Sequence, residues 1–404
     1  MSRVVMAGMP AWGHVNPSLP IMRELTRRGV EVTYYTGEEF RAPVERAGCE
    51  FRAYPPGTIS VAGIAEATQS GSTLRVVTRV LRATESLLPF LRDELAGDPP
   101  AAIAFDSNAI WGRMAAASLG VPMISLMTTF LVGGKDLSCL TAREWACFLG
   151  PTIRDLPRTV AAKQRVVRRF GKRIYPPSPT LPMRGDVTIF PIPRWLQGDD
   201  PRIDASCHYV GPTFPEGGDS APDAELAAFL DEPGPLVLVS LGTLHAGSGA
   251  FFHACFEALG DLPARVLIAT GGVDPAGLGR PPAGTLVRAS VPQREVLRHA
   301  SAFVTHGGMN SALEGLARGV PLVVVPQQAE QLIIGRKVAG RGAGTVLRHA
   351  MSRRPVPAGE LRTAVERALT DPSLRVAAKE AGASLGEGGG AVAAAEAIQN
   401  RLGA

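Results

Sequence analysis

Two titratable side chains stand directly after short apolar runs in the first half of the sequence. His14 follows the run at 2–8, and Asp106 follows the run at 101–105. Runs of this length and composition predict buried strands. If the two strands are parallel, their carboxyl ends meet at one edge of a sheet, where α/β proteins bind ligands. His14 could then act as a general base, and Asp106 could hold its second ring nitrogen, as in a triad whose nucleophile is the substrate.

The glycines around His14 have the spacing of a phosphate-binding Walker A loop, but the chemistry of that loop is missing. His14 and Val15 stand where the loop needs its Lys and its Ser or Thr. This excludes an ATPase of that kind, and the segment also lacks the GxGxxG pattern of a dinucleotide site. Two structural roles stay open: His14 could cap the helix expected at 17–29, and Asp106 could cap the helix expected at 109–119.

A second polar cluster, THGGMNSALE at 305–314, follows an apolar run in the second half of the sequence. Its glycines allow the backbone to approach a phosphate, and the helix that follows offers N–H groups and a favourable dipole at its N-terminus. An acidic residue one turn into that helix can accept hydrogen bonds from a ribose. A plain strand–turn–helix connection would not need so many polar residues and glycines. The pattern predicts a nucleotide site that includes His306, Asn310, Ser311 and Glu314.

Two further loops in the same half have the composition of ligand-binding loops. In the SLGT motif, Gly242 and Thr243 end an apolar run and could contact a phosphate or the transferred group. In the PQQAEQ motif, Glu330 and Gln331 follow another run and form a pair suited to sugar hydroxyls. Each loop alone is a weak signal, and together they favour a nucleotide-sugar ligand.

Apolar runs alternate with amphipathic stretches along most of the 404 residues, a length that predicts two to three domains. Repeated strand–helix–strand units predict parallel, doubly wound sheets. A stretch rich in Gly and Pro interrupts the pattern near 211–222. We therefore predict two Rossmann-like α/β domains at 1–210 and 233–385, a linker at 211–232, and a helix at 386–404 that packs back on the first domain.

Composition and charge exclude several classes of protein. Hydrophobic residues make up 45% and charged residues 20%, which argues against disorder. Five cysteines without a CxxC pair argue against a disulfide framework or a zinc site and favour the cytoplasm. No apolar run reaches the length of a membrane span, and the N-terminus is a poor signal peptide. The net charge of +5 is small for this length, so no nucleic-acid partner is expected.

One stretch departs from this balance of charge. Residues 153–173 contain eight Lys and Arg residues against one Asp. Such a run predicts a solvated helix face. A patch for a membrane surface or for an anionic ligand is the alternative.

The sequence resembles a known family at motifs spread over nearly its whole length. These motifs are GHVNPSLP, VTYYTGEEF, IPRWLQ, YVGP, VSLGT, and the long run from VPQREVL through THGGMNS to PQQAEQ. Together they resemble the GT-B nucleotide-sugar glycosyltransferases of the macrolide glycosyltransferase branch, which glycosylate natural products. The resemblance implies a GT-B fold, in which an N-terminal acceptor-binding domain and a C-terminal donor-binding domain face a central cleft.

The resemblance also implies a role for each candidate residue. His14 would be the general base and Asp106 its partner. Many relatives carry an aromatic residue that stacks on the base just before the VPQ motif, and this sequence has Ser290 there. The donor would be held at the base by Val291 and Gln293, at the diphosphate by His306, Gly308, Asn310 and Ser311, at the ribose by Glu314, and at the sugar by Glu330 and Gln331.

The implied reaction moves a hexose from a nucleoside diphosphate sugar to a hydroxyl of a hydrophobic natural product, such as a macrolide, polyketide or polyphenol. It would proceed with inversion and without a metal ion or other cofactor. UDP-glucose is the favoured donor, and a dTDP-deoxysugar transferase of antibiotic biosynthesis is an alternative. A nucleotide-sugar epimerase or hydrolase and an inactive sugar-nucleotide-binding protein are further alternatives. Both a monomer and a homodimer are compatible with the sequence.

Overall fold

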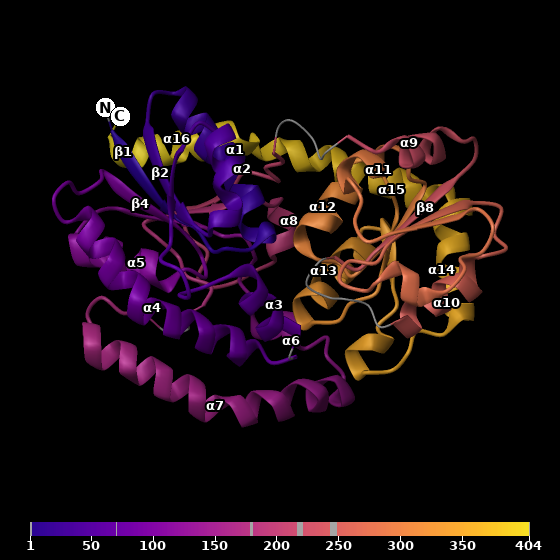
Figure 1. The fold of residues 1–404 in the computed structure, drawn as a ribbon, viewed down its shortest axis with the longest axis horizontal. Helices are drawn as coiled ribbons and strands as arrows, with labels where there is room; N and C mark the ends of the chain where they lie inside the picture. Colours follow the sequence, from indigo (N-terminus) through magenta and orange to yellow (C-terminus); the bar gives the residue numbers. More distant parts are fainter. Residues whose placement is uncertain (1, 70, 178–180, 216–220, 243–248, 404) are drawn as a thin grey trace. The chain divides into compact units, whose positions relative to one another are not determined.

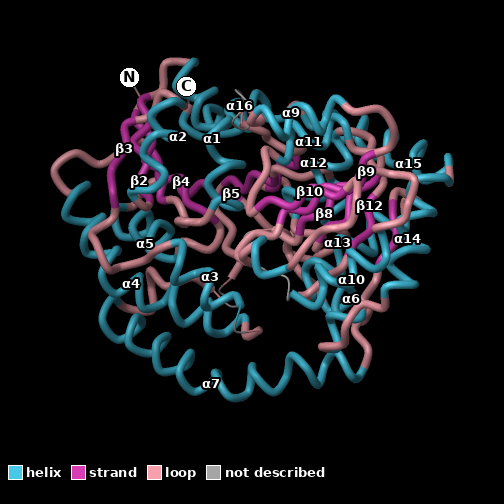
Figure 2. The backbone as a smooth tube through the Cα atoms, turned by 45° about the vertical axis from the view of Figure 1, so that its right-hand side comes forward, coloured by secondary structure: helices cyan, strands magenta, loops and turns pink. Residues whose placement is uncertain are grey.

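The computed structural model describes residues 2–69, 71–177, 181–215, 221–242 and 249–403 (Figure 1). The chain forms two compact units. Unit 1 consists of Met1–Leu131, Phe148–Glu216 and Gly386–Ala404, and unit 2 consists of Val132–Cys147 and Gly217–Leu385. Each unit is built on one parallel sheet with helices around it (Figure 2). The predicted fold class, with two Rossmann-like parallel sheets, is confirmed.

The sheet of unit 1 has seven parallel strands within the described residues, in the order β3-β2-β1-β4-β5-β6-β7. This is the Rossmann order with one strand added, and the direction of winding reverses between β1 and β4. The strands in the middle of the sheet are buried on both faces, which is why they read as unbroken apolar runs. The strands are β1 (Arg3–Ala7), β2 (Glu31–Thr36), β3 (Glu50–Ala53), β4 (Ala102–Asp106), β5 (Met123–Leu126), β6 (Val187–Phe190) and β7 (Cys207–Tyr209).

Helices cover both faces of this sheet. Val5 and Phe105 lie in a core with α4 and α5, whereas Val4 and Ala104 lie in a core with α1 and α16. Neighbouring residues of a strand point to opposite faces, so each strand contributes to both cores. The helices of this unit are α1 (Trp12–Arg27), α2 (Arg41–Arg46), α3 (Val61–Gln69), α4 (Thr73–Leu95), α5 (Ile110–Leu119), α7 (Ala142–Phe170, which begins in unit 2), α8 (Arg194–Gln197) and α16 (Gly390–Leu402).

Unit 2 repeats the same design. Its six strands within the described part of the chain are all parallel, in the order β10-β9-β8-β11-β12-β13, and the winding reverses between β8 and β11. The strands are β8 (Leu236–Ser240), β9 (Arg265–Ala269), β10 (Thr285–Arg288), β11 (Ala302–Thr305), β12 (Leu322–Val324) and β13 (Gly344–Val346). The helices are α6 (Gly134–Leu137), α9 (Ala224–Asp231), α10 (Gly249–Leu259), α11 (Gln293–His299), α12 (Met309–Ala317), α13 (Ala329–Gly340), α14 (Ala358–Thr370) and α15 (Pro372–Ala383).

The course of the chain departs from the expected boundaries at two segments, Val132–Cys147 and the part of the predicted linker that forms α9 in unit 2. Val132–Cys147 comes from the first half of the sequence but belongs to unit 2. There the buried carboxylate of Glu144 accepts two hydrogen bonds from the Arg348 guanidinium, at 2.9 and 2.5 Å. A bidentate pair of this kind fixes the segment on unit 2. Of the predicted linker 211–232, residues 216–220 lie outside the described residues. Helix α16 packs against α1 within unit 1.

Helix α1 begins earlier than the sequence suggested. The spacing of the apolar residues Leu19, Ile21, Met22 and Leu25 predicts a helix that begins at Pro17. Instead α1 runs from Trp12, and Pro17 lies inside it. Proline has no N–H group, so Pro17 cannot donate the helical hydrogen bond to the carbonyl of Gly13. Gly13 is exposed to solvent. The earlier start places His14 in the first turn of α1.

Candidate active site

Three polar side chains follow three neighbouring strands of unit 1. His14 lies in the first turn of α1, the helix that follows β1. Asp106 is the last residue of β4, and Thr128 follows β5. Because β1, β4 and β5 are adjacent and parallel, their carboxyl ends meet at one edge of the sheet. The winding reverses at this point, which is where α/β sheets bind ligands. The structure thus brings together the two residues that the sequence analysis paired, His14 and Asp106.

The three side chains form a closed set of hydrogen bonds. His14 Nδ1 is 2.8 Å from Asp106 Oδ2 and 2.8 Å from Thr128 Oγ1. The Thr128 hydroxyl donates to Asp106 Oδ2 at 2.8 Å. Since the hydroxyl proton goes to the carboxylate, both neighbours of Nδ1 present acceptors to it. The proton of the neutral imidazole is therefore held on Nδ1, and Nε2 carries the lone pair.

The side chains of Asp106 and His14 differ in how deeply they are buried. The side chain of Asp106 is 1% exposed and that of His14 is 25% exposed. Asp106 Oδ1 also accepts from the backbone N–H of Asn108 at 2.9 Å, so three donors compensate the buried carboxyl group. The capping role is not observed, because the N-cap of α5 is Ala109. Asp106 therefore accepts hydrogen bonds from the His14 imidazole and from the backbone of the turn before α5.

Buried aromatic residues hold the loop from which His14 projects. A Cβ on Gly8 would lie 2.6 Å from Tyr34 Cε1, so only glycine fits there. The Tyr54 hydroxyl donates to the Gly8 carbonyl at 3.0 Å and accepts from Trp111 Nε1 at 2.8 Å. Burial raises the pKa of both tyrosine hydroxyls, so they remain neutral. These contacts fix the start of α1, and a rigid support is what a catalytic side chain requires.

The second predicted cluster lies at the corresponding edge of the sheet in unit 2. Gly242 follows β8 and His306 follows β11, and these neighbouring strands flank the reversal of winding. A Cβ on Gly242 would lie 2.8 Å from Cε1 of the His306 ring, and its φ of +78° also favours glycine. The structure therefore places Gly242 and His306 side by side. Thr243 lies outside the described residues.

Helix α12 begins within this cluster. Gly307 has a φ of +79°, and a Cβ there would lie 2.6 Å from a valine side chain of β12. Gly308 is the N-cap of α12, and a Cβ on it would collide with the His306 ring. Both glycines are needed for the chain to turn from β11 into α12 beside His306. The N–H groups of the first turn, which include those of Asn310 and Ser311, find no acceptor inside the helix, so this terminus suits an anion.

Helix α11 brings a further predicted residue to α12. Gln293 Nε2 lies 3.2 Å from Ser311 Oγ and donates to Glu314 Oε2 at 2.6 Å. Val291 is half-buried in the loop just before α11. The structure thus gathers the residues that the resemblance assigned to the base, the phosphate and the ribose. Their roles remain predictions, and the contacts of Gln293 with Ser311 and Glu314 are observed.

Glu330 and Gln331 lie after the next strand along the same edge. They stand in the first turn of α13, which follows β12. Gln331 is buried, and its Oε1 accepts from the backbone N–H of Gln327 at 2.8 Å, whereas Glu330 is half-buried. The side-chain oxygen of Gln331 is therefore used in a hydrogen bond within the loop. The side-chain NH2 group is the end of Gln331 that could reach a sugar.

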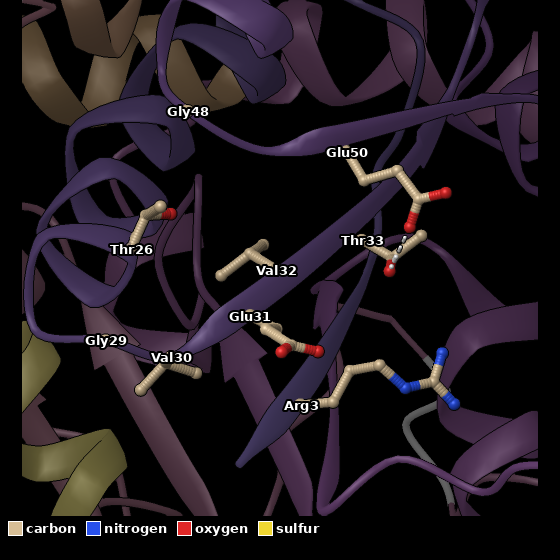
Figure 3. Close-up of a pocket in the computed structure, with 9 residues that line it drawn as sticks. All are labelled: Arg3, Thr26, Gly29, Val30, Glu31, Val32, Thr33, Gly48 and Glu50. Atoms are coloured by element: carbon tan, nitrogen blue, oxygen red, sulfur yellow. Dashed lines mark hydrogen bonds between the residues drawn. The ribbon is translucent and has the colours of Figure 1, made fainter. Parts of the chain in front are cut away.

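A pocket of about 430 Å³ lies at the opposite edge of the sheet of unit 1 (Figure 3). Its lining comes from β1, β2, β3, the end of α1 and the loops that precede β2 and β3, and it includes Arg3, Glu31 and Glu50. Thr33 donates to Glu50 Oε2 at 3.0 Å, as Figure 3 shows. Because Arg3, Glu31 and Glu50 stand at the first position of their strands and His14 follows the last position of β1, the pocket is separate from the cluster around His14.

Thr128 is the residue that the sequence analysis missed. Its signal was present, because a hydroxyl residue directly follows a third apolar run, at 121–127. The order of the strands in the sheet was needed to show that this run lies beside β4. No group of three or more His, Cys, Asp or Glu side chains converges as a metal site in the part of the chain that the structure describes.

Comparison with known proteins finds matches over nearly the whole chain. Residues 219–380 match the family described as UDP-glucoronosyl and UDP-glucosyl transferase. The NDP-glycosyltransferase YjiC of Bacillus subtilis is 31% identical over 98% of this chain and 96% of its own. Demethyllactenocin mycarosyltransferase of Streptomyces fradiae is 30% identical over 100% of this chain and 87% of its own. The solved structure of the glycotransferase of kitacinnamycin matches with a TM-score of 0.80 and 28% identity, over 99% of this chain and 98% of its own. Both clusters therefore lie in matched regions.

Proposed function

Because the chain belongs to the UDP-glucoronosyl and UDP-glucosyl transferase family, and is a GT-B glycosyltransferase of natural products, we propose that it transfers a hexose with inversion to a hydroxyl of a hydrophobic acceptor. The sugar comes from a nucleoside diphosphate sugar. The observation that carries the proposal is the 2.8 Å contact between His14 Nδ1 and Asp106 Oδ2. That contact leaves Nε2 as a base for the proton of a bound hydroxyl.

On the acceptor side, His14 is the catalytic residue. The acceptor oxygen attacks the anomeric carbon and forms the new C–O bond while its proton passes to His14 Nε2. The bond between the anomeric carbon and the diphosphate breaks, and its electron pair leaves with the diphosphate. Attack opposite to the leaving group inverts the configuration. Asp106 and Thr128 are positioning residues that stabilise the imidazolium from the Nδ1 side, and general-base help of this kind contributes about 10²- to 10⁴-fold.

On the donor side, the N-terminus of α12 binds the diphosphate. The N–H groups of its first turn and the His306 ring face an anion placed there, and such preorganised groups stabilise the charge that develops on a leaving group. Ser311 and Glu314 lie within the first turn and a half of α12, and Gln293 of α11 bonds both of them. These three residues bind the base and the ribose of the donor, and the loop that carries Glu330 and Gln331 binds its sugar.

Transfer is expected without a divalent metal ion. The helix terminus and His306 supply the positive electrostatic potential that a metal ion supplies to diphosphates in other enzymes. Initial rates measured with excess EDTA should equal those measured with added magnesium. A strict requirement for a divalent ion would contradict this part of the proposal.

UDP-glucose is the favoured donor, and a dTDP-deoxysugar is the second candidate. The similarity to a family described by UDP-linked sugars supports the first. The full-length similarity to a mycarosyltransferase supports the second. Supplying one donor at a time distinguishes them, because only the donor that the enzyme uses yields a glycosylated product.

Mass spectrometry of an acceptor panel tests the function. Purified protein is incubated with UDP-glucose or dTDP-glucose, EDTA, and a set of macrolides, polyketides and polyphenols. His14→Ala serves as the inactive variant, and His253→Ala, which changes an exposed histidine of α10, serves as its matched control. A gain of one hexose with the wild type and with His253→Ala, absent with His14→Ala, is the expected result.

Two results would contradict the proposal. Release of free UDP or of an epimerised sugar without any acceptor product would favour a hydrolase or an epimerase. Equal transfer by His14→Ala and the wild type would remove His14 from the mechanism. Donor binding should persist in His14→Ala, because His14 lies in unit 1 and the donor residues lie in unit 2.

A further inference from the structure

Helix α7 carries a continuous row of exposed apolar side chains. In the part of α7 that belongs to unit 1, Leu149, Ile153, Leu156 and Val160 are 50%, 60%, 49% and 42% exposed. Their spacing of three or four residues places them on one face of the helix, and we call this face the apolar ridge. Single exposed apolar residues are ordinary on protein surfaces, whereas a contiguous apolar row marks a contact surface.

The apolar ridge is not the face by which α7 packs on its unit. That inner face is held by polar contacts to α4: Arg75 Nε donates to Asp155 Oδ2 at 3.0 Å, and Thr78 Oγ1 lies 2.8 Å from Thr159 Oγ1. The ridge lies roughly a third of a turn around the helix axis from these residues. In both ribbon and tube views, α4 lies between α7 and the sheet, and α7 is the outer layer (Figures 1 and 2).

The rest of the exposed surface of this part of α7 is basic. The acidic residue at 155 is buried, so every exposed charge between 148 and 170 is positive. Two of these cations also pair with acidic residues: Arg165 with Glu85 of α4 at 3.1 Å, and Arg154 with Asp155 at 3.7 Å. Most of them lie on the side of the exposed surface opposite the apolar ridge, across small residues. The exposed cations are Arg154, Arg158, Lys163, Arg165, Arg168 and Arg169.

An apolar ridge on one side of an exposed helix surface, with cations on the other side, is the pattern of a helix that lies in the interface of a membrane. We infer that α7 docks this protein peripherally onto lipid bilayers that carry anionic headgroups. The apolar ridge enters the boundary between headgroups and acyl chains, and the arginines reach headgroup phosphates through their long aliphatic stems. Across the described residues, no helix has the length and apolar character needed to cross a membrane.

Charge decides between a bilayer and other occupants of this surface. A second copy of the chain would bring two like-charged α7 surfaces together, which is unfavourable. A nucleic acid would satisfy the cations but would leave the apolar ridge in water, since phosphate contacts use no aliphatic row. An anionic bilayer satisfies both parts of the surface at once.

Vesicle flotation with the full chain tests the inference. One set of vesicles is pure phosphatidylcholine, and the other contains equal amounts of phosphatidylcholine and phosphatidylglycerol. The wild type should float with the anionic vesicles only, and less so as salt is raised. The double variant Ile153→Ser with Leu156→Ser should lower the partition coefficient at least about tenfold. The double variant Arg158→Gln with Arg168→Gln should lower it about fivefold per charge removed.

A matched control changes the same kinds of residue elsewhere. Arg375→Gln with Val376→Ser alters an exposed cation and an exposed valine on α15, and vesicle binding should stay within about twofold of the wild type. All variants change exposed side chains, so circular dichroism should show unchanged melting.

Three results would overturn the inference. The first is absence of wild-type binding to anionic vesicles. The second is binding that survives the apolar substitutions and disappears only with the charge substitutions, which would mark a polyanion surface. The third is a lipid-free dimer of the wild type that the apolar double variant dissociates, which would mark the apolar ridge as an interface between copies.

Discussion

Replacing Asp106 by asparagine tests the reasoning about the imidazole most directly. The carboxylate accepts three hydrogen bonds on two oxygens: Asn108 N on Oδ1, and both Thr128 Oγ1 and His14 Nδ1 on Oδ2. An amide of the same shape has one oxygen only. In either orientation its NH2 group therefore meets at least one donor. Asp106→Asn thus keeps the volume and removes the acceptor pattern.

The expected loss can be worked out for each orientation of the new amide. If the NH2 group faces Asn108, one buried bond to a charged acceptor is lost, worth about 1.5–3 kcal/mol or about 10- to 150-fold. If it faces His14, the imidazole must move its proton to Nε2 to accept from the amide, and the base is lost. The same exchange in a serine protease triad lowers kcat about 10⁴-fold. We therefore expect kcat to fall by between about 10-fold and about 10⁴-fold, with the KM for the nucleotide sugar unchanged.

The assay is the initial rate of sugar transfer, followed by mass spectrometry, with thermal unfolding measured in parallel. Asp155→Asn is the matched control, because it also removes a buried carboxylate, but one on α7 that pairs with Arg75 of α4. Both variants should lose stability, and only Asp106→Asn should lose rate. A folded Asp106→Asn enzyme with kcat within about threefold of the wild type would refute the assigned role.

Three further predictions follow from single contacts. Thr128→Val should lower kcat about 10-fold or more with little change in KM, because the Thr128 hydroxyl contacts both His14 and Asp106. Thr128→Ser keeps the hydroxyl and should retain most of the rate. Equal rates for the two variants would contradict this role. Gly308→Ala should weaken UDP binding at least about tenfold by calorimetry, because its methyl group displaces the His306 ring, whereas Gly359→Ala, in open space, should not; equal affinities would contradict the assignment of that loop. Hydrogen bonds from two neighbouring arginines lower the pKa of Glu24 from 4.5 to about 2. Its contribution to stability is then complete above about pH 4.5 and is lost as pH falls toward 2, so urea unfolding of Glu24→Gln should depend less on pH in that window than unfolding of the wild type; parallel curves would count against this pair.

Much of the fold and of the site could be predicted from the sequence. Buried parallel strands are apolar on both faces, so each appears as an uninterrupted run with a polar residue at its end. His14, Asp106, His306 and Gly308 each stand at such an end, and the structure places them at the reversals of winding in the two sheets. Their residue types, at the ends of strands, were enough to indicate a base with its partner and an anion site.

Other features depended on contacts between distant segments. The start of α1 at Trp12 could not be predicted, because proline is locally unfavourable inside a helix, and Pro17 nevertheless lies inside α1. The place of Val132–Cys147 depends on the ion pair between Glu144 and Arg348, two residues far apart in the chain. No local pattern predicts a contact of that kind.

The sequence by itself determined the class of the protein. The periodicity of apolar residues predicted the alternation of strands and helices, and the motifs at strand ends indicated the kind of site. Only the tertiary structure decided which strand ends are neighbours. That is why Thr128 joins His14 and Asp106, and why Gln293 reaches Ser311 and Glu314. The physical reason is that hydrophobic periodicity records which face of an element is buried, whereas contacts between side chains depend on strand order and register, which arise only when the whole sheet packs.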